Sequence, residues 1–212
     1  KKYKKFIFIT STFISSKKRL NQMIKQEKRI TKTKELLKKR INAKIFEFKL
    51  FNEFLKLIRL LSKDFPDLNI VIKPHPTEDP KDWVKNIKKY RNVYVDSQFE
   101  LTPYIAAAEL VIFNLSISGI QSVMMNKKTI CYSTLKQNDS LRSFPNKFGI
   151  VCNNYNKLKK NINKNSKNNF NINLKEMKKR IYISRKYSSD VIIDDLIKNF
   201  KFNKKSKKKK HL

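Results

Sequence analysis

Six short runs of apolar, β-branched and aromatic residues recur along the chain, and they constrain the fold more than any other feature of the sequence. They span residues 6–10, 69–73, 93–96, 110–114, 129–132 and 149–152. Segments with helical periodicity or helix-start residues separate most of these runs. Nearly continuous apolar strands that alternate with helices are typical of a parallel sheet covered on both faces. The sequence therefore predicts an α/β fold, with a Rossmann-like parallel sheet and helices on both faces.

The clearest helix is predicted at residues 51–61, where Phe51, Phe54, Leu55, Ile58 and Leu61 recur at helical spacing. Others are predicted at 80–90, 102–108 and 120–125, with one or two more within 174–200. A length of 212 residues suits one domain, or one and a half. We assign residues 1–200 to one domain. Residues 201–212, KFNKKSKKKKHL, hold seven lysines and are predicted to form a disordered tail.

Residues 17–44 differ from the rest of this domain, because twelve basic residues are opposed by Glu27 and Glu35 alone. Leu20, Met23 and Ile24 fall near helical spacing, so we predict a basic helical insertion of one or two amphipathic helices. Two roles remain open for this insertion. It is either a solvated helical segment or a helix that binds an anionic membrane surface.

The formal net charge is +33, from 50 Lys and Arg residues against 17 Asp and Glu residues. Such a surface attracts nucleic acid through counterion release. However, 42 of the 50 basic residues are lysine and 22 residues are asparagine, a composition typical of an AT-rich genome. Base recognition favours arginine. We therefore disfavour nucleic-acid binding, and contact with an anionic membrane surface fits the charge at least as well.

Several classes of protein and site are excluded or disfavoured by composition. No apolar run approaches the roughly 18 residues of a membrane span. Cys131 and Cys152 lie in apolar runs, which argues against a disulfide scaffold and predicts two core residues. With two histidines and two glycines, the chain offers no zinc site, no GxGxxG fingerprint and no P-loop. We expect neither a bound metal nor a cofactor.

The segment KPHPTE, residues 73–78, is the first candidate for a functional loop. In an open α/β sheet, ligands bind beyond the carboxyl ends of the strands, and this segment leaves the strand predicted at 69–73. Two prolines restrict the backbone around His75, whose ring can donate a hydrogen bond to a phosphate or a leaving-group oxygen. Lys73 adds positive charge. The alternative is a histidine packed in a proline-rich turn without a ligand.

The segment NLSISGIQ, residues 114–121, is the second candidate. Ser116, Ser118 and Gly119 allow a close backbone approach to a ligand, and the predicted helix behind them offers free N–H groups to a diphosphate. Ordinary helix capping by serine is the alternative. The two loops together, in this order and behind strands of one sheet, are more specific than either alone.

With both loops in place, the sequence resembles the C-terminal half of a GT-B-type glycosyltransferase. More narrowly, it resembles the bacterial surface carbohydrate biosynthesis proteins, a capsule- and lipopolysaccharide-related family. The matching blocks are FIFITSTF, FLKLIRLLSKDFPDLNIVIKPHPTEDPKDW, NVYVD, LTPYIAAAELVIFNLSISGIQSVMMNKKTICYS and YISRKYSSDVIIDDLIKNF. They cover most of residues 5–200, are interrupted at 17–44 and fade in the asparagine-rich stretch.

The resemblance implies a nucleotide-sugar site in a cleft between two Rossmann-like halves. It places Lys73 and His75 against the phosphates, with Ser116, Ser118 and Gly119 beneath the diphosphate. It also implies transfer of a glycosyl group for surface polysaccharide synthesis, in which His75 stabilises the departing phosphate. The sequence identifies no catalytic base.

Two further residues follow from the same resemblance. Gln121 takes the place of an acidic residue that commonly holds a ribose hydroxyl, and glutamine can form this hydrogen bond without a charge. Glu78 matches the glutamate that follows the HP pair. It either contacts the ligand or braces its own loop.

A complete GT-B enzyme has two such halves, whereas this chain resembles one. We expect either a fragment of a two-domain enzyme or a single domain that works with a partner subunit. The alternative function is a non-catalytic basic α/β domain that binds an anionic membrane surface or a partner complex. Because no secretion signal and no paired cysteines are evident, we expect a cytoplasmic location, with peripheral attachment at the inner membrane face as a second option.

Overall fold

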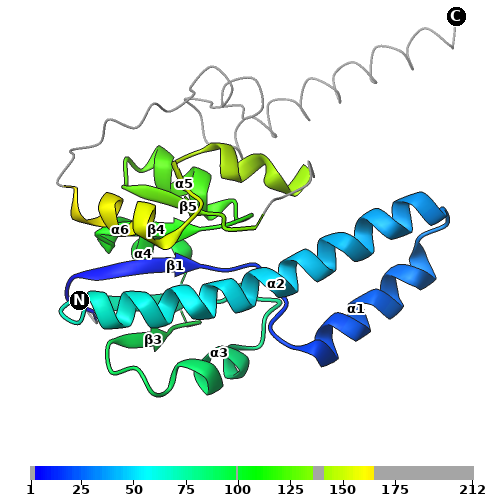
Figure 1. The fold of residues 1–212 in the computed structure, drawn as a ribbon, viewed down its shortest axis with the longest axis horizontal. Coiled ribbons are helices and arrows are strands. Elements are labelled where there is room, and N and C mark those ends of the chain that lie inside the picture. The colour runs from blue at the N-terminus through cyan, green and yellow to red at the C-terminus, as the bar shows by residue number, and fades with distance from the viewer. Residues whose placement is uncertain (1–2, 99, 136–140, 165–212) are drawn as a thin grey trace, which may run out of the picture. The chain divides into compact units, whose positions relative to one another are not determined.

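The computed structural model describes residues 3–98, 100–135 and 141–164, and within them the predicted Rossmann-like α/β fold is confirmed (Figure 1). Six strands pair in the order β3-β2-β1-β4-β5-β6, and each pairing is parallel. The strands are β1 (Phe6–Thr10), β2 (Asn69–Lys73), β3 (Val93–Val95), β4 (Leu110–Phe113), β5 (Thr129–Tyr132) and β6 (Ile150–Cys152).

The α-helices of the described residues are α1 (Lys17–Ile30), α2 (Lys34–Asp64), α3 (Pro80–Ile87), α4 (Leu101–Ala107), α5 (Ser118–Met124) and α6 (Tyr155–Asn163). Five of these six helices lie between successive strands and α6 follows β6; three helices, α1, α3 and α6, start behind a residue whose side chain caps them. Pro80 opens α3 behind Asp79, whose side chain accepts a hydrogen bond from the Lys81 N–H. Proline at the first helical position and aspartate at the N-cap are both favoured, so this helix begins where the sequence predicts.

The strand order reverses at β1. From β1 the chain builds outward to β2 and β3, and then crosses back to place β4 on the other side of β1. The connections that leave β1 and β4 therefore diverge over opposite faces of the sheet. This divergence opens a crevice at the carboxyl edge of the strands, which is the usual ligand position in doubly wound sheets.

Each face of the sheet carries its own apolar core, because side chains alternate along a strand. On one face, Phe54 and Ile58 of α2 pack with Ile9 of β1, in a core that also includes residues of α3 and α6. On the other face, Phe8 stacks on Tyr104 of α4 with ring centroids 5.3 Å apart. Helices thus cover both faces, as expected for buried parallel strands.

The basic segment 17–44 is helical, and it extends directly into the helix predicted separately at 51–61. α2 runs for 31 residues without a glycine or proline to break it. Its second half packs on the sheet, whereas its first half pairs with α1. Figure 1 shows α1 and the start of α2 as a helical hairpin beyond the end of β1. The hairpin therefore lies at the carboxyl edge of the sheet.

Two helical elements lie outside the predicted set, namely α6 and the 3₁₀ helix η1 (Leu141–Lys147). The asparagine-rich composition obscured α6, yet Asn154 caps it by accepting from the Lys157 N–H at 2.8 Å, and Leu158 anchors it in the core. The helices predicted within 174–200 and the tail at 201–212 fall outside the described residues. Across the described part of the chain, no helix is long and apolar enough to cross a membrane.

Gly119 permits close packing between α5 and β4. A Cβ atom at this position would lie 2.3–2.5 Å from three ring atoms of Phe113. The Phe113 side chain is fully buried, and because protein interiors are closely packed, displacement of its ring would be costly. The glycine is therefore explained by helix-to-strand packing.

We expect Gly119→Ala to lower the free energy of unfolding by about 1–3 kcal/mol, because overpacking outweighs the higher helix propensity of alanine. Urea unfolding followed by circular dichroism measures the change. Gln121→Ala, at an exposed position of the same helix, is the matched control and should stay within about 0.5 kcal/mol of the parent. A Gly119→Ala variant as stable as the parent would contradict the packing argument.

Candidate functional site

A pocket of about 430 Å³ lies at the carboxyl edge of the sheet, beside the point where the strand order reverses. Its walls come from the β1–α1 loop, the helical hairpin, the β2–α3 loop and the β4–α5 loop. The lining residues are Thr12, Phe13, Ile14, Arg19, Met23, Lys44, Glu47, His75, Thr77 and Leu115. This volume falls within the roughly 300–1,000 Å³ of small-molecule sites.

Glu78 holds two of these loops together. Its side chain is buried, and Oε2 accepts hydrogen bonds from Ser11 Oγ at 3.0 Å and Trp83 Nε1 at 2.7 Å. Oε1 accepts from the backbone N–H groups of Phe13 at 3.0 Å and His75 at 3.3 Å. Ser11 and Phe13 follow β1, whereas His75 follows β2. Both carboxylate oxygens are therefore occupied by protein donors, and the geometry gives Glu78 a bracing position.

The His75 ring is exposed, and its orientation is fixed by Thr77. The Thr77 N–H donates to His75 Nδ1 at 3.2 Å, and Thr77 Oγ1 lies 2.8 Å from the same nitrogen. Because Nδ1 accepts a hydrogen bond, the proton of the neutral ring resides on Nε2. His75 therefore presents an Nε2–H donor, which suits a phosphate or a leaving-group oxygen.

The helical hairpin gives the pocket its charge. Lys44 Nζ lies 3.5 Å from Glu47 Oε2, and both side chains are buried. The Arg19 guanidinium has no ion-pair partner among the described residues. The lining thus holds two cations and one carboxylate, an excess of one positive charge when His75 is neutral. This balance favours an anionic ligand.

Leu115 forms the wall contributed by the β4–α5 loop, and its backbone is strained. Its φ angle is 59°, in the left-handed region that a leucine rarely adopts. The Leu115 N–H donates to Asn146 Oδ1 at 2.7 Å, and Asn146 Nδ2 donates to Asn114 Oδ1 at 2.9 Å. Asn114 Nδ2 in turn donates to the Tyr132 carbonyl at 2.6 Å. This chain of amide hydrogen bonds stabilises the strained turn that places Leu115 at the pocket.

The hydroxyl groups of the β4–α5 loop bond to one another. Ser118 Oγ lies 2.7 Å from Ser116 Oγ and 2.6 Å from Thr10 Oγ1, and all three side chains are buried. The Ser118 N–H also approaches Ser116 Oγ at 3.3 Å. Ser116 and Ser118 therefore tie the start of α5 to the end of β1.

Lys73 lies on the other face of the sheet from the larger core. Its ammonium is 5.4 Å from the centroid of the Tyr104 ring, in the smaller core beside α4. Burial lowers the pKa of Lys73, while the nearby carboxylate of Asp96 acts in the opposite direction. The structure therefore separates Lys73, the last residue of β2, from His75, which lies in the loop that follows this strand.

The structure brings part of the predicted site together. Among the predicted site residues, His75 lines the pocket and Glu78 braces the loop behind it. Five others, all described, lie outside its lining: Lys73, Ser116, Ser118, Gly119 and Gln121.

Three charged lining residues, Arg19, Lys44 and Glu47, were not predicted. They lie in the hairpin, which the sequence marks chiefly as a basic surface. One indication was present: Glu47 is an isolated acid within the apolar run IFEFKLF, three positions after Lys44. An acid inside an apolar helical run, three positions after a lysine, indicates burial with a partner.

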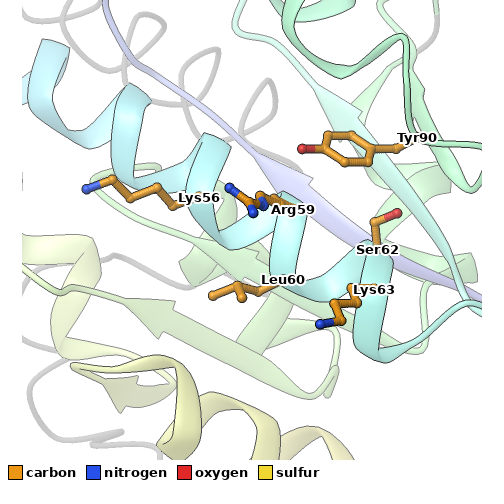
Figure 2. A pocket seen from close by; sticks show the side chains of 6 residues that line it. All are labelled: Lys56, Arg59, Leu60, Ser62, Lys63 and Tyr90. Carbon is orange, nitrogen blue, oxygen red and sulfur yellow. The ribbon is translucent and has the colours of Figure 1, made fainter.

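A second hollow of about 460 Å³ lies on the outer side of α2 (Figure 2). It is lined by Lys56, Arg59, Leu60, Ser62, Lys63 and Tyr90. In Figure 2 these side chains are spread along one helix and one neighbouring loop. None of them comes from a loop at the carboxyl edge of the sheet. The pocket at the strand ends is therefore the stronger candidate, because loops from separate strands converge there.

Comparison with known proteins assigns no family, since no family model matches the chain and no curated protein matches it significantly. Among the described residues, no group of three His, Cys, Asp or Glu side chains is placed to hold a metal ion.

The pH dependence of stability tests the environment of Glu78. Burial raises the pKa of Glu78, and its four hydrogen-bond donors oppose that rise. At a pH between the ordinary and the raised pKa, Glu78 keeps its proton in the folded protein and has lost it in the unfolded chain. The contribution of Glu78 to stability therefore falls as pH rises. We expect the unfolding free energy of the parent, relative to Glu78→Gln, to decrease as pH rises above the ordinary titration range of a glutamate.

Glu109→Gln, at an exposed position, is the control for the removal of one carboxylate and is measured over the same range. Chemical unfolding at each pH supplies the values. A parent-minus-variant difference that grows with pH would show that the four donors outweigh burial.

Proposed function

We propose that this domain binds a nucleotide-sugar, as a glycosyltransferase-like donor-binding domain in surface polysaccharide synthesis. One observation carries the proposal. A cationic pocket of about 430 Å³ lies at the carboxyl edge of the sheet and is lined by the loops that follow β1 and β4. These strands flank the topological switch point, where doubly wound sheets bind nucleotides.

The chemistry of the lining supports a phosphate-bearing ligand. The Arg19 guanidinium is a planar fork that matches phosphate oxygens, and it lies in the pocket without an ion-pair partner among the described residues. The His75 Nε2–H supplies a second donor. Thr12 offers a hydroxyl group that can bond to a ribose or sugar hydroxyl.

The sugar-transfer part of the proposal rests on the resemblance of the KPHPTE and NLSISGIQ segments to surface carbohydrate biosynthesis proteins. In a transfer reaction, negative charge develops on the departing nucleotide phosphate. A hydrogen bond from His75 Nε2 and the charge of Arg19 would stabilise that phosphate, which is the usual way a protein assists such a leaving group.

Thermal-shift and calorimetric titrations with UDP, CMP, CDP, GDP and TDP test the proposal. We expect one of these nucleotides to raise the Tm of the parent. His75→Ala should weaken its binding by about tenfold, and Arg19→Ala by about 10- to 100-fold, because each removes a hydrogen bond to a charged group.

Arg59→Ala is the matched control, since it removes the same charge from the hollow in Figure 2 and should leave nucleotide affinity unchanged. Two results would contradict the proposal. One is a folded parent whose Tm responds to none of the nucleotides. The other is an Arg59→Ala variant that loses as much affinity as Arg19→Ala.

A further inference from the structure

The tip of the helical hairpin exposes two large aliphatic side chains. We define the hairpin tip as residues 28–38, which include the end of α1, the connection at 31–33 and the first turn of α2. Ile30, the last residue of α1, is 58% exposed, and Leu36 in α2 is 44% exposed. Neither side chain belongs to an apolar core of the fold, and α1 has no buried residue.

The same tip carries concentrated positive charge. Five exposed cations within it have no ion-pair partner among the described residues: Lys28, Arg29, Lys32, Lys34 and Lys38. The two acidic residues of the region are already paired, Glu27 with Arg40 at 3.1 Å and Glu35 with Lys39 at 2.6 Å. The unpaired cations therefore surround the exposed aliphatic groups without internal neutralisation.

We propose that the hairpin tip docks on an anionic membrane surface, with Ile30 and Leu36 entering the interface and the flanking lysines contacting lipid headgroups. Basic residues beside aliphatic ones are the combination that holds a helical segment at an anionic bilayer surface. The proposal concerns surface contact and stands independently of the ligand in the pocket.

The composition of the tip favours a bilayer over a nucleic acid. No aromatic residue occurs between positions 25 and 40, so the tip has no ring on which a base could stack. One arginine is unpaired against four lysines, whereas arginine is the residue that reads bases and phosphates in a fixed geometry. Nucleic-acid binding also gives no role to the two exposed aliphatic side chains.

Docking at the tip would place the pocket close to the bilayer. Ile30 lies eleven residues after Arg19 on α1, which corresponds to about 16.5 Å at 1.5 Å per residue. A ligand beside Arg19 would then lie within reach of an acceptor embedded in that surface.

Co-sedimentation with vesicles of phosphatidylcholine alone, or with about 30% phosphatidylglycerol, tests the charge component at about 0.1 M salt. We expect binding to the anionic vesicles only. Lys28→Glu combined with Lys32→Glu should reduce the partition coefficient by about 25-fold or more, at about fivefold per basic residue.

Lys81→Glu combined with Lys85→Glu is the matched control, because both positions are exposed on α3 and the net charge falls by the same amount. We expect this pair to change binding by about twofold or less. Equal losses for the two pairs would overturn the proposal, since binding would then follow total charge. The proposal would also be overturned if the Lys28→Glu, Lys32→Glu variant lost binding to an oligouridylate while its vesicle binding stayed unchanged. That result would identify a nucleic-acid surface.

A polarity-sensitive fluorophore at Ile30→Cys tests insertion directly. Labelling is selective in the folded protein, because Cys131 and Cys152 are 1% and 0% exposed. We expect a blue shift on addition of anionic vesicles at this position, and none for the same label at Lys85→Cys. A bound protein whose Ile30→Cys label stays in a water-like environment would refute insertion of the tip.

Discussion

The buried carboxylate of Glu78 is the contact on which the candidate site depends. It joins the loop after β1 to the loop after β2 and also receives the indole N–H of Trp83. Removal of the Glu78 carboxylate would leave its hydrogen-bond donors unpaired, and each unpaired buried donor would lower the free energy of unfolding by about 1–3 kcal/mol. Because the two loops are tied at this point, the His75 backbone is fixed against the sheet. The ring then stands at the pocket, where Thr77 sets its tautomer.

The fold was predictable because its main determinants are local and repeated. Strands such as FIFIT and LVIF are almost entirely apolar, which indicates burial on both faces regardless of their neighbours. The strand order could not be predicted from local patterns, since pairing between β1 and β4 joins residues about a hundred positions apart. The continuity of α2 also lay beyond prediction. The composition of α2 changes from basic to apolar because its first half pairs with α1 and its second half packs on the sheet. This change does not mark a break in the helix.

The site was predicted less completely, for a physical reason. Loop chemistry predicted a role for His75, and the structure places this residue in the pocket lining, in the loop after β2. Ser116 and Ser118 carry suitable groups, but they bond to each other and to Thr10, which depends on a contact across the sheet. Gly119 is explained by the ring of Phe113. Arg19 and Glu47 join the pocket through the path of a helical hairpin, and no local pattern encodes that path.

The central claim is that one pocket, at the strand ends beneath the hairpin, is the ligand site. Amide chemical-shift mapping by two-dimensional NMR, during titration with the nucleotide that raises the Tm, locates binding residue by residue. The claim predicts that the largest shifts fall at Thr12, Arg19, His75 and Thr77, which come from three separate segments of the pocket. Shifts centred on Arg59, Lys63 and Tyr90 would place the ligand in the outer hollow of Figure 2 and contradict the account.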